Sequence, residues 1–214
     1  MKFLLLAYFL LFLLWATPTF SQIPEAAKNN FNTIIAIMEG VTISGVLSII
    51  TFLGDSLISN NIKDKLVGLF FIPRPGETIF SRISNKTIRD DRFLISEAIS
   101  HYSDIIENRP LQIRDEPYYE NASWYKIYIE YKKEEAVMQA QTDYLLCRDL
   151  YIETLGFLVL YASSLFLFNG FVIFSWRFTL TLFVMAVITN ISAQTKMNRF
   201  VNTVIAIDLS KTQS

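Results

Sequence analysis

Two charged residues lie within apolar stretches of this chain: Glu39 in residues 32–54 and Arg177 in residues 171–193. Inside a bilayer an isolated charge is costly, and such residues often mark ion or proton pathways. Glu39 is either a pathway residue, or a structural partner or interfacial residue near the end of its helix. Arg177 either pairs with Glu39 or extends its charge to the membrane surface beside Trp176.

A stripe of small residues repeats at a spacing of four, at Ala36, Gly40, Ser44 and Ser48. Small side chains at this spacing let a neighbouring helix approach closely. The stripe therefore predicts a helix contact, either within one subunit or between subunits of a homo-oligomer.

The sequence contains few residues that could form a metal site, a disulfide or a catalytic cluster. His101 and Cys147 are the single residues of their types, so no histidine cluster, cysteine metal site or internal disulfide is expected. We predict no catalytic residues, no metal site and no cofactor. The net charge of −1 argues against a nucleic-acid partner. The aromatic residues around Trp124 and Tyr128 are expected to pack rather than to stack on bases.

The apolar residues are clustered, which favours a membrane protein. Residues 55–150 carry 13 of the 19 basic and 16 of the 20 acidic residues. The predicted fold is an all-α membrane protein with three or four transmembrane helices and a mostly helical domain between the second and third. The predicted segments are a first transmembrane helix or signal peptide at 1–21, transmembrane helices at 32–54, 151–168 and 171–193, the domain at 55–150 and a tail at 194–214.

The basic residues near the ends of these spans set the predicted orientation. Seven of them lie on one side and two on the other, with a turn at Asn169-Gly170. This places the domain at 55–150 and the tail in the cytoplasm of a bacterium, below a multi-pass inner-membrane anchor whose partner is the lipid bilayer.

Within the domain, apolar spacing predicts helices at 56–71 and 92–106, a loop at 107–121 and one long helix from 123 to 150. Arg148 and Asp149 lie at the end of this last helix. We expect one of them to bond to the domain's own residues 90–92.

Four short motifs resemble those of a family of bacterial inner-membrane proteins of uncharacterised activity. They are Pro75-Gly76, Asp90-Asp91-Arg92, the block NASWYKIY from Asn121 to Tyr128, and LLCRD from Leu145 to Asp149. The resemblance covers residues 63–170 in order. It implies an inner-membrane setting and a phage-defence context, and it carries no activity.

The sequence favours a non-enzymatic subunit, an anchor or sensor whose domain docks a cytoplasmic protein partner. One alternative is a small oligomeric pore or membrane-disrupting effector. An intramembrane enzyme is the weakest alternative, because the apolar segments contain no paired aspartates, Ser-Lys dyad or His-Glu motif.

Overall fold

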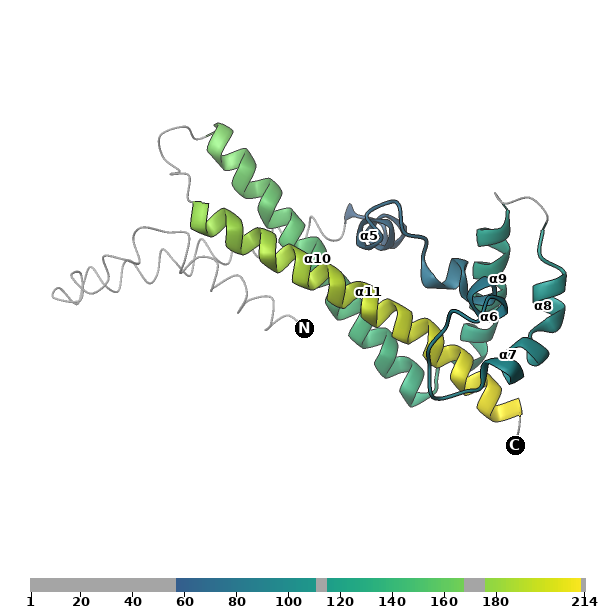
Figure 1. Ribbon diagram of the computed structural model, residues 1–214. Helices are drawn as coiled ribbons and strands as arrows, with labels where there is room; N and C mark the ends of the chain where they lie inside the picture. The colour runs from purple at the N-terminus through teal and green to yellow at the C-terminus, as the bar shows by residue number, and fades with distance from the viewer. Residues whose placement is uncertain (1–56, 111–114, 168–175, 213–214) are drawn as a thin grey trace. The chain divides into compact units, whose positions relative to one another are not determined.

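The computed structural model describes residues 57–110, 115–167 and 176–212, and it contains no β-strand within them (Figure 1). The helices described are α5 (Asn60–Val67), the 3-10 helix η1 (Pro75–Glu77), α6 (Ile79–Ser84), α7 (Ile95–His101), α8 (Ser103–Glu107), α9 (Glu116–Tyr131), α10 (Glu135–Leu167) and α11 (Trp176–Thr212).

The prediction of membrane-spanning helices is wrong for these residues: none of the helices described is long and apolar enough to cross a bilayer. The described parts of the spans predicted at 151–168 and 171–193, residues 151–167 and 176–193, lie in α10 and α11. Both helices continue into charged sequence, α10 through Arg148 and Glu153 and α11 through Lys196. This finding contradicts the predicted fold class of three or four transmembrane helices. It also contradicts the multi-pass inner-membrane localisation and the cytoplasmic orientation that followed from it. The predicted segments 1–21 and 32–54 lie outside the described residues.

The chain divides into two compact units. Unit 1 combines Met1–Ser59 with Asp149–Ile188, and unit 2 combines Asn60–Arg148 with Thr189–Ser214. In the described part of unit 1, α10 buries Tyr151, Thr154 and Phe157, and α11 buries Leu182 and Ala186. Unit 2 holds the remaining helices, and the predicted tail at 194–214 is part of it.

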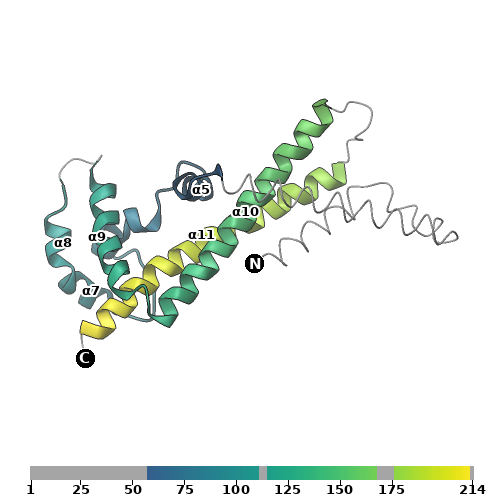
Figure 2. The same ribbon diagram turned by 180° about the vertical axis from the view of Figure 1, so that it is seen from behind.

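The C-terminal half of α11 forms the core of unit 2. Residues 200–206 are all buried, as are Asp208 and Leu209. Apolar side chains from the surrounding helices are buried too, among them Phe80 of α6, Ala98 of α7 and Val137 of α10. Both ribbon views show this half of α11 passing beside α7 and α9 (Figures 1 and 2). Unit 2 is therefore built around a helix from the end of the chain.

The long helix predicted from 123 to 150 is broken in the structure. α9 ends at Tyr131 and α10 begins at Glu135, and the Glu134 backbone N–H donates to the Tyr131 carbonyl at 3.0 Å in the turn between them. The change of direction lets Trp124 and Tyr128 of α9 and Tyr144 of α10 all pack against Phe200 of α11. Burial of this aromatic cluster outweighs the helical propensity of residues 132–134.

A buried carboxylate begins α6. Glu120 of α9 is fully buried and accepts hydrogen bonds from the backbone N–H groups of Phe80, at 2.8 Å, and Ser81, at 3.0 Å. The Ser81 hydroxyl also bonds to it, and Arg109 lies 3.8 Å away. Burial raises the pKa of Glu120, against the opposing effect of these bonds. The carboxylate satisfies N–H groups that the first turn of a helix leaves unpaired.

The segment between α6 and α7 is fixed to α11 through Arg92. Its guanidinium donates to Asp90 at 2.7 Å and 2.8 Å and to the Thr203 hydroxyl at 2.8 Å. The hydrogen bonds from Arg92 hold the pKa of Asp90 below 3.8. A carboxylate with a lowered pKa stabilises the folded state above its unfolded pKa, and this stability is lost as the pH falls through the folded value.

We therefore expect Asp90→Asn to lower the free energy of unfolding by about 1 kcal/mol at pH 7, since Arg92 is partly exposed. The difference from the wild type should shrink towards zero as the pH falls well below 3.8. Urea unfolding at a series of pH values measures this, with Asp91→Asn at the exposed neighbouring position as control. A difference that is constant with pH would contradict the assignment.

Candidate functional site

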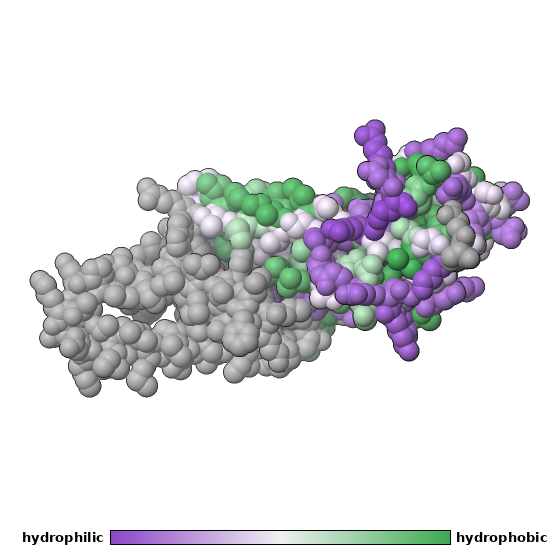
Figure 3. Space-filling view, turned by 90° about the horizontal axis from the view of Figure 1, so that it is seen from below, coloured by the Kyte–Doolittle hydropathy of each residue, from purple (hydrophilic) through white to green (hydrophobic). Residues whose placement is uncertain are grey.

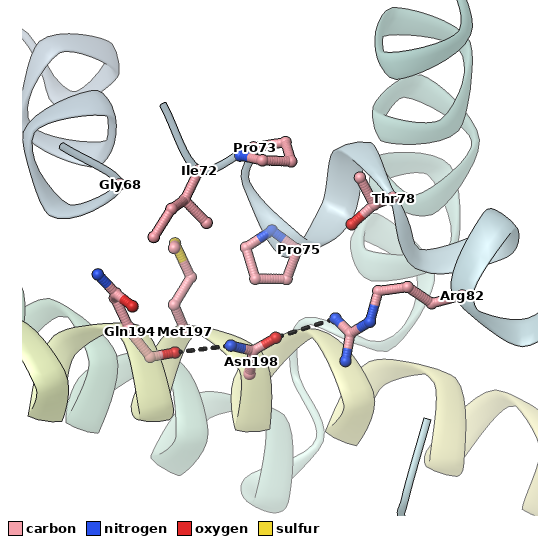
Figure 4. Close-up of a pocket in the computed structure, with 9 residues that line it drawn as sticks. All are labelled: Gly68, Ile72, Pro73, Pro75, Thr78, Arg82, Gln194, Met197 and Asn198. Atoms are coloured by element: carbon pink, nitrogen blue, oxygen red, sulfur yellow. Dashed lines mark hydrogen bonds between the residues drawn. The ribbon is translucent and has the colours of Figure 1, made fainter. Parts of the chain in front are cut away.

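A pocket of about 220 Å³ opens in unit 2 between the segment before α6 and the middle of α11. Figure 4 shows Ile72, Pro75 and Met197 on its apolar side and the Arg82 guanidinium at its polar end. Pro73, Thr78, Gln194 and Asn198 also line it. Pockets for drug-sized ligands hold about 300 Å³ or more, so this one suits a single side chain better than a whole cofactor.

A strained turn forms one wall of the pocket. After α5, the Phe70 N–H bonds to the Lys65 carbonyl and the Leu69 N–H to the Leu66 carbonyl, both at 2.9 Å, which is a Schellman helix end. Glycine normally occupies the left-handed position of this motif. Here that conformation is adopted by Leu69 and Phe70, whose φ values are 50° and 62°. Two such residues cost about 1 kcal/mol each.

The glycine of this turn lies one position earlier, where close packing requires it. The Ile72 backbone N–H donates to the Gly68 carbonyl at 2.9 Å. A Cβ at Gly68 would stand 2.4 Å from the Ile72 carbonyl oxygen, so a larger residue would displace the turn. Gly68 therefore fixes Ile72 against the pocket.

Residues 69–72, which we call the apolar loop, are exposed. The exposed fractions are 48% for Leu69, 65% for Phe70, 91% for Phe71 and 51% for Ile72. Scattered exposed apolar residues are ordinary, but a contiguous group is typical of an interaction surface. The face of unit 2 in Figure 3 is mostly hydrophilic, with separate hydrophobic groups among the polar residues.

Arg82 differs from the other arginines that are partly buried in unit 2. Arg74 pairs with Glu77, Arg109 with Glu116 and Arg148 with Asp64. Arg82 donates one hydrogen bond, from Nη1 to the Asn198 Oδ1 at 2.9 Å, and has no acidic partner among the described residues. Burial alone lowers the pKa of Arg82. An arginine remains charged in proteins, so this guanidinium is a half-buried cation whose charge is not matched.

The polar neighbours of Arg82 explain why its charge stays unmatched. Glu77, the nearest acid along the chain, accepts from the Arg74 backbone at 2.9 Å and side chain at 2.8 Å. Gln194 donates to the Val67 carbonyl at 3.1 Å. The Thr78 hydroxyl has no hydrogen-bond partner in the described part of the chain and points into the pocket near Arg82 (Figure 4). The pocket thus offers an anion several N–H donors and a hydroxyl.

No family model, curated protein or solved structure matches the chain. The resemblance to a bacterial membrane-protein family remains a prediction. The structure does bring two of its motifs together: a Cβ at Gly76 would lie 2.9 Å from Asn121 Oδ1 and 3.3 Å from the Trp124 ring. The glycine therefore lets η1 lie against α9.

The predicted aromatic residues form part of the core. Trp124 is 8% exposed and stacks on Tyr128, with ring centroids 5.5 Å apart. Its indole N–H donates to the Val201 carbonyl at 3.4 Å, and the Tyr128 hydroxyl bonds to Gln141 at 3.2 Å. These contacts support packing as their role.

Arg148 bonds within unit 2, but to α5 rather than to residues 90–92. Its guanidinium donates to Asp64 and to Asn60, each at 3.1 Å, and lies over the Tyr144 ring. The Tyr144 hydroxyl donates to the same Asp64 carboxylate at 2.6 Å. Burial and the neighbouring Asp64 charge raise the pKa of Tyr144. Asp149 follows on α10 and belongs to unit 1.

Glu39, Gly40, Ser44 and Ser48 lie outside the described residues. Arg177 lies in the first turn of α11, in unit 1, and its pairing with Glu39 likewise falls outside the described residues.

A second polar cluster lies at the end of α11. Asp208 accepts from the Tyr102 hydroxyl at 2.5 Å, and His101 Nε2 lies 3.4 Å from the same carboxylate. Burial raises the pKa of Tyr102, and burial together with Asp208 raises the pKa of Tyr131 to about 12. Phenols with raised pKa values stay protonated, so they act here as hydrogen-bond donors and not as nucleophiles. No group of acids, histidines or cysteines in the described residues is placed to hold a metal ion.

Apart from Pro75, the residues that line the pocket belong to no functional motif in the sequence. Arg82 lies in the short stretch IFSRIS, where its position gives no sign of a missing partner. Residues 69–71 of the apolar loop were included in the helix predicted at 56–71, although Gly68 and Pro73 on either side of the loop are a signal of a turn.

Proposed function

We propose that unit 2 is a non-enzymatic docking module that binds a partner protein through the apolar loop and the adjoining Arg82 pocket. The observation that carries the proposal is the unmatched guanidinium beside four exposed apolar side chains. Protein interfaces combine apolar anchors, often aromatic, with a few charged groups in this way.

The backbone of the apolar loop supports this function. Non-glycine residues with positive φ are found where the surrounding structure holds them, often at binding sites. Phe71 is 91% exposed. A side chain this exposed adds little to the stability of unit 2. The strained turn is therefore best explained by contacts of Phe71 with another molecule.

The electrostatics of the surface favour a different protein over a second copy of this chain. In a twofold contact each copy offers the same patch to the other. Such a contact at the pocket would bring two Arg82 guanidinium groups together without a described carboxylate to match them. A partner segment with apolar residues and an acid would complement the surface.

Phe71→Ser should weaken partner binding by about tenfold or more, because an exposed aromatic anchor contributes about 2 kcal/mol. To obtain the partner, p-benzoylphenylalanine is placed at position 71 of the full chain in its native host and cross-linked by light. The captured protein is purified, and its affinity for the wild type and for Phe71→Ser is measured by calorimetry.

Leu94 provides the matched control, because it is 62% exposed and lies before α7, away from the pocket lining. Leu94→Ser should leave the affinity unchanged, and the cross-linker at position 94 should not capture the same protein. Equal capture at both positions, or equal affinities of the two serine variants, would refute the docking surface. A product of twice the chain's mass would identify a second copy as the occupant and refute a different partner.

A further inference from the structure

Among the described residues Arg82 is held in place without a counter-ion, and the pocket beside it is of side-chain size. Burying a charge is unfavourable unless an opposite charge and hydrogen bonds accompany it. Every other partly buried arginine of unit 2 named above has a carboxylate partner from within the unit. The missing carboxylate at Arg82 has space to enter from outside.

We infer that the Arg82 pocket is a carboxylate-binding site that takes the side chain of an aspartate or glutamate from the partner's docking segment. This inference rests on the proposed docking function and adds the chemistry of the anchor residue. The guanidinium binds the carboxylate, and the Thr78 hydroxyl donates a further hydrogen bond. Ile72, Pro75 and Met197 contact the methylene groups that carry it.

Three features of the pocket select this ligand. Its volume of about 220 Å³ admits one side chain. A single guanidinium matches the single charge of a carboxylate better than the greater charge of a phosphate dianion. Chain-terminal carboxylates are typically captured by backbone N–H groups in nests, whereas the donors facing this pocket are the side chains of Arg82 and Thr78.

The test uses three small probes with the full chain. N-acetylglutamic acid α-amide carries only the side-chain carboxylate. Its isomer N-acetylglutamine carries only the α-carboxylate, and N-acetylglutamine amide is neutral. Binding is followed through NMR shifts of the Arg82 side-chain Nε–H and the Thr78 backbone N–H.

The first probe should give saturable shifts at both groups and bind at least several-fold more tightly than the second, while the neutral probe should give none. Arg82→Gln should weaken binding about tenfold or more, since a charge-assisted bond is lost. Arg89→Gln, at an exposed arginine outside the pocket, should leave binding within about twofold. Thr78→Val, which retains the guanidinium, should weaken binding by a smaller factor.

Equal shifts with the neutral probe, or unchanged binding in Arg82→Gln, would overturn the site. Tighter binding of N-acetylglutamine would overturn the side-chain source, and tighter binding of inorganic phosphate would overturn the carboxylate class. If Arg82→Gln fails to fold, unchanged binding in Thr78→Val would still refute the geometry.

The two proposals fail separately. Binding of the first probe at Arg82, with no effect of Phe71→Ser on the partner's affinity, would retain the carboxylate site and reject the docking surface. An effect of Phe71→Ser without any probe binding would do the reverse.

Discussion

Glu120→Ala is expected to destabilise unit 2 more than any other single change considered for this protein. The substitution removes the acceptor for two backbone N–H groups at the start of α6 and for the Ser81 hydroxyl. Leaving buried donors without partners costs roughly 1–3 kcal/mol each. We expect a loss of about 3 kcal/mol in the free energy of unfolding, and a Tm lower by roughly 6–12 °C for a chain of this size.

Thermal and urea unfolding measure this effect, with Glu116→Ala as the matched control. Glu116 lies one helical turn earlier on α9 and contacts the same Ser81 and Arg109 side chains, but its side chain is 32% exposed. The control should therefore cost less than about 1 kcal/mol. Similar losses from both substitutions would show that burial of Glu120 and its backbone bonds do not determine the stability of this region.

Arg148→Ala should have the second-largest effect, about 2–3 kcal/mol, because it removes one partner of a buried ion pair. Among the described residues, the variant leaves Asp64 with the Tyr144 hydroxyl as its side-chain partner, and it removes the bond to Asn60. α5 is also bound through the Val67 carbonyl, which accepts from Asn190 at 2.9 Å. The helix should therefore loosen at its first turn while unit 2 remains folded.

Hydrogen exchange measures this loosening directly, as faster exchange of the backbone amides of residues 60–67. Arg92→Ala is the control, since Arg92 also forms an ion pair in unit 2 but bonds to Asp90 and Thr203. We expect it to leave exchange at residues 60–67 unchanged. Faster exchange at residues 107–121 in Arg148→Ala, with α5 unaltered, would contradict the assignment of Arg148 to α5.

Local sequence patterns predicted those helices whose apolar residues contact the core at helical spacing. The block from Trp124 to Tyr128 was predicted to pack, and in the structure both rings meet Phe200. The break at residues 132–134 was not predictable, because no glycine or proline marks it. It results from contacts with α11, which lies about seventy residues further along the chain.

The apolar composition led to a wrong prediction of the fold class. Residues 154–193 have the composition of membrane spans. The described helices that contain residues 154–167 and 176–193 are continuous with charged, core-forming helix in unit 2. Composition measures how apolar a stretch is and not where its helix ends. The partner of Arg148 was missed for a related reason: Asp64 lies 84 positions earlier, and sequence spacing gives no information about such a contact.

The candidate site could not be predicted from the sequence, because a charge without a partner is a property of the folded chain. In the sequence Arg82 lies five residues from its nearest acid, Glu77, so a local ion pair is as plausible there as at Arg74. Only the fold shows that Glu77 and Glu120 are committed to other partners. The strain at Leu69 and Phe70 likewise appears only in the backbone angles.

A hydrogen-exchange footprint of the purified complex with the captured protein tests whether the partner docks on the apolar loop and the Arg82 pocket. Docking there should protect the amides of residues 68–82. An alternative surface exists on α9, where Tyr118, Tyr125 and Ile129 are exposed. Protection confined to residues 118–129, with residues 68–82 exchanging as in the free chain, would refute docking at the loop and pocket.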